Sequence, residues 1–203
     1  MWTPPVSCVP ALIQAQTGCH KKVTVWRSQE RERRVSADFV AHSAGQLEFA
    51  GRTVRCVLGK GGTVPAADKR EGDGASPAGT WPMRRVFYRP DRVPPPETGL
   101  PVVALSPDDG WCDAPDDPAY NRPVTLPYAA SHEKLWRDDH VYDLIVELGY
   151  NDAPPVPGRG SAIFMHLARP DWAGTEGCVA LPYLDLLDVL RLAKDGSEVE
   201  IRI

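Results

Sequence analysis

Short apolar runs separated by Gly and Pro make up most of the chain after residue 34. Runs of this length that are rich in Val, Ile, Phe and Trp predict β-strands, and the final run alternates apolar and charged residues as a strand with one face in solvent does. The predicted strands are Asp38 to His42, Gln46 to Ala50, Thr53 to Leu58, Trp81 to Tyr88, Val102 to Leu105, Val141 to Leu148, Ala162 to His166 and Glu198 to Ile203.

Strong helical spacing occurs in one segment, Tyr183 to Ala193. Two apolar stripes at intervals of three and four residues fit it, and Pro182 suits its first turn. A second, short helix is predicted at Glu133 to Asp138. Many strands and one strong helix predict a mainly β (α+β) fold. The two alternative stripes are Leu184, Leu187 and Leu190, or Leu186, Val189, Leu190 and Ala193.

The remaining segments suggest one domain with a tail. Residues 1–34 lack sustained periodicity and are interpreted as an N-terminal tail that includes a short strand at Lys22 to Trp26, and residues 35–203 are interpreted as the domain. Pro77 followed by Gly79 predicts a turn. The acidic and aromatic stretch from Asp108 to Pro127 is long for a structureless loop, so it is predicted to be functional or to hide a further element.

Composition excludes several classes of function. A net charge of −4 over 203 residues, with a pI of about 5.7, argues against the basic surface that nucleic-acid binding requires. The chain has no apolar run long enough for an ordinary transmembrane helix. Its five cysteines form no CxxC pair, and we predict neither metal nor cofactor. Structural or surface roles are expected for His42, His132, His140, Cys8, Cys19, Cys56 and Cys112, with Cys56 buried in its strand.

Near the C-terminus, the stretch HLARPDWAGTEGCVAL carries His166 and Cys178. A strand ending at His166 and a helix starting after Pro182 place both residues at one edge of the sheet. A neighbouring histidine can take the proton of a cysteine nucleophile, and the amides of Gly177 and Cys178 can point at an oxyanion. The residues alone leave a second interpretation open, because a cysteine in this context is often a buried apolar residue.

Two separated motifs carry a resemblance. SAIFMH followed by TEGCVAL resembles the active-site segment of the YkuD family of L,D-transpeptidases, in which a His is followed by a spacer and then by Ser or Thr, a variable residue, Gly and Cys. SPAGTW, from Ser76 to Trp81, is similar to the Thr-Pro-x-Gly-x-Phe segment of that family. The resemblance covers roughly residues 45–195.

The resemblance implies a YkuD-like β-sandwich in which a helix packs after the catalytic cysteine. It implies that Cys178 is the nucleophile, that His166 is the general base and acid, and that Thr175 or the carbonyl of Leu167 orients the histidine. Three features depart from the family pattern: the eight-residue spacer before Thr175, Glu176 in place of a frequent His, and Ala180 in place of a frequent Arg. The substitute cation is expected to be Arg169, Arg159 or Arg122.

The resemblance implies a function in peptidoglycan cross-linking. Cys178 would take the acyl group of a stem peptide with release of D-Ala and pass it to an amine, and carbapenem-type inhibitors would acylate the same thiol. Two alternatives are an L,D-carboxypeptidase and a catalytically degenerate domain that binds cell-wall peptide. The resemblance implies a location in the cell envelope or periplasm, whereas the starting segment MWTPPVSCVPALIQAQTGCHKK lacks the basic start and apolar stretch of a secretory signal, so a cytoplasmic location stays open. The oligomeric state is not indicated.

Overall fold

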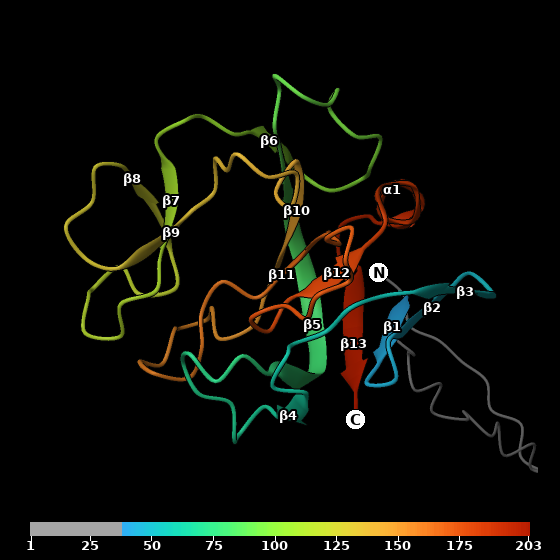
Figure 1. Cartoon of the computed structure of the whole chain (residues 1–203), viewed down its shortest axis with the longest axis horizontal. Coiled ribbons are helices and arrows are strands. Elements are labelled where there is room, and N and C mark those ends of the chain that lie inside the picture. Colours follow the sequence, from blue (N-terminus) through green and yellow to red (C-terminus); the bar gives the residue numbers. More distant parts are fainter. Residues whose placement is uncertain (1–37) are drawn as a thin grey trace, which may run out of the picture. The chain divides into compact units, whose positions relative to one another are not determined.

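The computed structural model describes residues 38–203 (Figure 1). The expected tail and the strand at Lys22 to Trp26 lie outside these residues. The described part is mainly β, as predicted, with one α-helix. Its elements are β1 (Phe39–His42), β2 (Gln46–Phe49), β3 (Arg52–Arg55), β4 (Thr63–Pro65), β5 (Ser76–Tyr88), β6 (Val102–Ala104), β7 (Asp109–Cys112), β8 (Pro123–Thr125), β9 (His132–Lys134), β10 (Leu144–Leu148), β11 (Phe164–Leu167), β12 (Val179–Leu181), α1 (Tyr183–Leu192) and β13 (Glu198–Arg202).

The long strand β5 joins two halves of one sheet, whose order is β12-β11-β10-β5-β13-β1-β2-β3. The first part of β5, from Gly79 to Pro82, pairs with β13, and the part from Met83 to Tyr88 pairs with β10. The two ends of the sheet meet where Val57, just after β3, forms a bridge with Ala180 in β12. The sheet therefore folds over its own core as a sandwich.

Strand alternation divides the buried side chains between two cores. Met165 and Leu167 of β11 join β1, β2, β13 and α1 in the main core, whereas Phe164 of the same strand packs in a second cluster with Trp111 of β7 and with Cys178. This second cluster fills the space between the large sheet and a separate three-stranded sheet ordered β8-β7-β9. Neighbouring residues of β11 therefore face two different environments.

Helix α1 follows β12 directly and buries Leu186, Val189 and Leu190. This is the second of the two predicted stripes, and Leu184 of the first stripe is 71% exposed. Pro182 stands at the N-cap, one position before the predicted first turn. Because α1 contacts β11 and shares its core with Met165 and Leu167, it supports the strand that carries His166.

Three local predictions are corrected by the structure. The segment predicted as a helix, Glu133 to Asp138, begins in β9, where Glu133 pairs with Trp111. A helix of about six residues has too little intrinsic stability to resist strand pairing. Pro77 and Gly79 lie inside β5 instead of forming a turn. The expected loop before α1 contains β12. The stretch from Asp108 to Pro127 contains β7 and β8, in agreement with the alternative that it includes a further element.

Candidate active site

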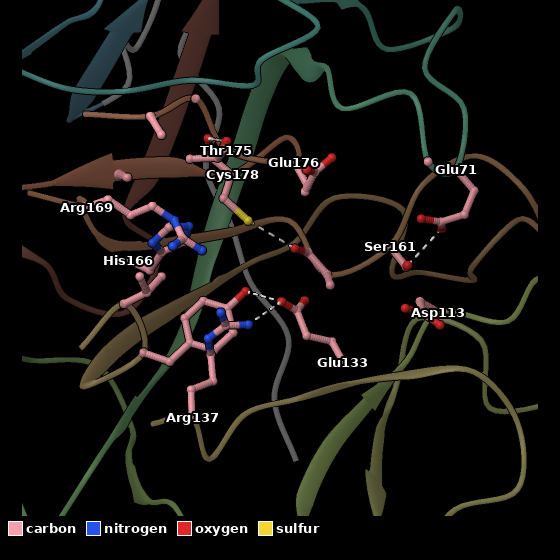
Figure 2. A pocket seen from close by; sticks show the side chains of 17 residues that line it. Glu71, Asp113, Glu133, Arg137, Ser161, His166, Arg169, Thr175, Glu176 and Cys178 are labelled. Carbon is pink, nitrogen blue, oxygen red and sulfur yellow. Dashed lines mark hydrogen bonds and ion pairs between the residues drawn. The ribbon is translucent and has the colours of Figure 1, made fainter. Parts of the chain in front are cut away.

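Parallel pairing of β11 with β12 brings the two predicted catalytic residues together. His166 is in register with Ala180, and Cys178 precedes Ala180 by two positions. Since side chains two apart along an extended segment point to the same face, Cys178 and Ala180 share the face on which His166 lies. All three line one pocket of about 390 Å³ (Figure 2).

Gly177 allows the chain to turn into the cysteine. Its φ of 132° lies in a region that side chains disfavour, and a Cβ added there would stand 2.7 Å from the carbonyl oxygen of Ala75. Thr175 braces the same turn, because its hydroxyl donates to the Cys178 carbonyl (2.7 Å) and accepts from the Gly177 amide (3.1 Å). A residue larger than glycine at 177 would displace Cys178.

His166 is buried, with 6% of its surface exposed. Its Nδ1 lies 2.9 Å from the Leu167 carbonyl oxygen, and because a carbonyl only accepts, Nδ1 carries the proton and Nε2 is left with the lone pair. Burial lowers the pKa of His166 to about 4, and the positive charges of Arg137 and Arg169 act in the same direction. The imidazole is therefore neutral at pH 7 and able to accept a proton.

Cys178 is a protonated thiol in this arrangement. Burial, together with the smaller effect of the Glu133 charge, raises its pKa to about 12. The Sγ atom donates to the Ala162 carbonyl oxygen (3.2 Å) and accepts from the Phe164 amide (3.3 Å). The resting pair is thus a neutral thiol and a neutral imidazole, so attack by sulfur requires transfer of the thiol proton to a base during the reaction.

The wall of the pocket carries both signs of charge. In the view of Figure 2, His166 and Arg169 lie on one side of the Cys178 sulfur, and Glu71 and Asp113 lie on the other. The cations of the lining are Arg137 and Arg169, and its anions are Glu71, Asp113, Glu133 and Glu176. A ligand with separated positive and negative groups matches this distribution.

Tyr142 and Glu133 form the part of the pocket wall next to His166. The Tyr142 ring packs edge-on against the His166 ring with centroids 5.3 Å apart, and the Tyr142 hydroxyl donates to Glu133 (2.6 Å). Burial raises the pKa of Glu133, and burial also raises that of Tyr142 well above its ordinary value. Arg137 lies 3.9 Å from Glu133 and pairs more closely with Asp139 (2.7 Å).

The predicted site residues are distributed as follows. Arg169 lines the pocket and lies 3.7 Å from Asp139, whereas Arg159 bonds to the Ala67 carbonyl and Arg122 lines a second groove. Thr175 lines the pocket but contacts the cysteine turn, and Leu167 supplies the partner of His166 Nδ1.

The sequence reasoning did not identify Arg137, Glu133 or Tyr142 as pocket residues. Arg137 and Glu133 fell in the segment predicted as a short helix, which gives no reason to place either at the pocket. Tyr142 lies in the apolar run ahead of β10, where nothing in the local pattern distinguishes it from a core residue. The strand pairing of β9 is what brings this part of the chain to the site.

The acidic and aromatic stretch from Asp108 to Pro127 mainly supports the residues around the pocket and contributes little to its lining. Trp111 and Tyr120 are buried, and Asn121 accepts hydrogen bonds from Trp111 Nε1 (2.9 Å) and from the Ala162 amide (3.0 Å). Ala162 has a positive φ of 52°, and its carbonyl receives the Cys178 thiol. From this stretch Asp113 reaches the pocket lining.

The other histidines and cysteines of residues 38–203 have ordinary surroundings. His42 lies 3.4 Å from Glu48, and Cys56 is buried as predicted. Within this range no group of three or more potential ligands is placed to hold a metal ion, and no helix is long and apolar enough to cross a membrane. Cys8 and Cys19 lie outside the described residues.

The fold and the pocket define a class of protein: a mainly β sandwich in which a cysteine and a neutral histidine share one wall of a charged pocket. The sequence model of the YkuD family, described as the L,D-transpeptidase catalytic domain, matches residues 39–201. The chain therefore belongs to the YkuD family.

Among solved structures, the chain is similar to the crystal structure of L,D-transpeptidase 1 from Mycobacterium tuberculosis, with 14% sequence identity and a TM-score of 0.37. The similarity covers 82% of this chain and 62% of that one, so this chain spans less than two thirds of the relative's length. No curated protein sequence matches the chain.

Proposed function

We propose that this protein is a cysteine-dependent L,D-transpeptidase that acts on peptidoglycan stem peptides. The observation that carries the proposal is the β11–β12 register, which sets His166 beside Cys178 in one pocket of a YkuD-family domain. The reaction is acyl transfer from the L residue of an L,D peptide bond to an amine. Family membership supplies the substrate class.

The proposed first half-reaction begins with neutral groups. Cys178 Sγ adds to the carbonyl carbon while its proton passes to Nε2 of His166, and the resulting oxyanion accepts a hydrogen bond from the Cys178 amide. The C–N bond then breaks, and the leaving D-amino acid, D-Ala in a tetrapeptide donor, takes the proton from His166. A thioester on Cys178 remains, and His166 is neutral again.

In the second half-reaction the amine of another stem attacks the thioester. His166 removes the proton of the attacking amine and returns a proton to the departing sulfur, so thiol and imidazole regain their resting forms. Water in place of the amine would give an L,D-carboxypeptidase, and the same residues serve both reactions. The charged lining favours a substrate that presents carboxylates to Arg137 and Arg169 and an ammonium group to Asp113 and Glu71.

Covalent labelling tests the nucleophile. The wild-type protein, Cys178→Ala and Cys112→Ala are incubated with a carbapenem and measured by intact mass. Cys112 is the matched control because it is also buried and lies in β7, outside the pocket lining. We expect one adduct on wild type and on Cys112→Ala and none on Cys178→Ala. An adduct that persists in Cys178→Ala would remove Cys178 as the nucleophile.

The acceptor is tested with a disaccharide tetrapeptide as sole substrate. Transpeptidation produces a cross-linked dimer, whereas hydrolysis produces a disaccharide tripeptide, and the two are separated by mass. A domain that binds the substrate without producing either would support the degenerate alternative. We expect the dimer.

A further inference from the structure

The two family motifs meet at one buried hydroxyl group. Ser76 begins β5 in the SPAGTW segment and is completely buried. Its Oγ donates to the Gly177 carbonyl oxygen (2.8 Å) and accepts from the Gly59 amide (2.9 Å). Ser76 is 101 positions from Gly177, so the fold, and not local sequence, creates this contact.

The hydrogen bond from Ser76 fixes the orientation of the Cys178 amide as well as that of the Gly177 carbonyl. The Gly177 carbonyl and the Cys178 amide belong to one planar trans peptide unit, in which C=O and N–H point in opposite directions. Holding the oxygen against β5 therefore directs the Cys178 N–H away from β5. A hydrogen bond received by the carbonyl also polarises the peptide and makes the N–H a stronger donor.

The neighbouring peptides are held by other groups. Thr175 accepts the Gly177 amide and donates to the Cys178 carbonyl. Among residues 38–203, apart from hydrogen bonds between paired strands, Ser76 is the one group that donates to the Gly177 carbonyl. Apart from the same strand-pairing bonds, no hydrogen bond in this range uses the Cys178 amide as its donor. The Gly177 amide is thus engaged within its own turn, while the Cys178 amide keeps its donor capacity.

We propose that Ser76 is a positioning residue that orients the Cys178 amide toward the oxyanion formed when the cysteine attacks an acyl carbon. This inference rests on the proposed function. Of the two amides that the sequence suggested as oxyanion donors, it selects that of Cys178. If Ser76 only held β5 against Gly59 and Gly177, Ser76→Ala would lower the stability of the fold without a selective loss of acylation.

Two reactions of the same thiol separate these roles. Acylation by a carbapenem passes through an oxyanion, whereas alkylation by iodoacetamide displaces iodide and forms none. Both rates are measured on the folded full-length protein, by intact mass for acylation and by mapping the Cys178 peptide for alkylation. The variants are Ser76→Ala, Ser76→Thr, which keeps the hydroxyl, and Ser197→Ala.

Ser197 is the matched control. It is also buried, with 1% of its surface exposed, and its hydroxyl accepts from the Lys194 amide (3.2 Å) in the turn before β13, outside the pocket lining. Thermal unfolding of each variant reports the structural contribution of each hydroxyl. If Ser76→Ala does not fold, Ser76→Cys replaces it, because a thiol of similar size is a weaker donor.

We expect Ser76→Ala to slow carbapenem acylation about 10- to 100-fold, somewhat less than direct loss of an oxyanion donor, and to change the alkylation rate less than about threefold. Ser76→Thr should restore most of the acylation rate, and Ser197→Ala should keep it while lowering the unfolding temperature. Equal losses in acylation and alkylation, or an unchanged acylation rate in Ser76→Ala, would overturn the inference. A wild-type protein that the carbapenem does not acylate would overturn the proposed function, and this inference with it.

Discussion

Lowering the pH from 7 to 4 is expected to destabilise the fold through His166. Burial holds the pKa of His166 at about 4 in the folded protein, whereas the free side chain has a value of 6.5. Between these values the unfolded chain takes up a proton that the folded protein does not. The stabilisation from the neutral imidazole is therefore complete above pH 6.5 and is lost as the pH falls to 4, and its size is about 3 kcal/mol.

The measurement is urea unfolding, followed by tryptophan fluorescence, at intervals between about pH 7.5 and pH 4. The comparison is His166→Asn, because an asparagine amide can take the place of Nδ1 as the donor to the Leu167 carbonyl without titrating. Carboxylates that titrate in this range are common to both proteins and cancel in the difference. Cys178, with a pKa raised to about 12, stays protonated throughout.

The difference in unfolding free energy between wild type and His166→Asn should shift by about 3 kcal/mol across this range, in favour of wild type at the neutral end. A constant difference would refute the reasoning, because it would mean that His166 titrates alike in both states. The same pKa predicts that the acylation rate has no acid limb near pH 6.5 and declines only toward pH 4.

The remaining predictions concern the turn at Gly177, the pocket cation Arg169 and the buried lysine Lys69. Gly177→Ala should destabilise the fold more than Gly196→Ala in urea unfolding: both have positive φ, but the Cβ added at 177 meets a backbone carbonyl oxygen at 2.7 Å, and at 196 it meets nothing within 4 Å. Arg169→Gln should raise KM for a carboxylate-bearing donor about tenfold, whereas Arg122→Gln, outside the pocket, should leave KM unchanged; equal effects would refute the assignment. Lys69→Met should lower the free energy of unfolding in urea by about 3 kcal/mol, because Lys69 is 2% exposed and its ammonium group pairs with the Asp73 carboxylate.

The sequence predicted the strands that have a clear apolar pattern. The runs at β1, β2, β10 and β13 were found within a few residues because each carries several buried apolar side chains. The strands β7, β8 and β9 were missed, since they are short and contain Gly, Pro and charged residues. Their stability comes from pairing with one another across the chain, which no local pattern reveals.

The candidate site was inferred in outline from two motifs, whereas its geometry depends on strand register. Proximity of His166 and Cys178 followed from placing both at one sheet edge, but the strand that aligns them, β12, was assigned to a loop. Its three residues Val179–Leu181 are too few to show alternation. Arg137 and Glu133 reach the pocket through β9, so an error in one short element concealed both of them.

The register also explains how the pocket can lack an arginine after the cysteine. A side chain at position 180 is the cross-strand neighbour of His166, so an arginine there would place a cation directly against the imidazole. Burial and two arginines already lower the pKa of His166, and a third cation would lower it further and weaken the base. With Ala180 at that position, the cations of the pocket come from Arg137 and Arg169, both held near Asp139, whose charge opposes their effect on His166. Under the proposed function, this arrangement lets cationic recognition of the substrate and a usable base coexist in one pocket.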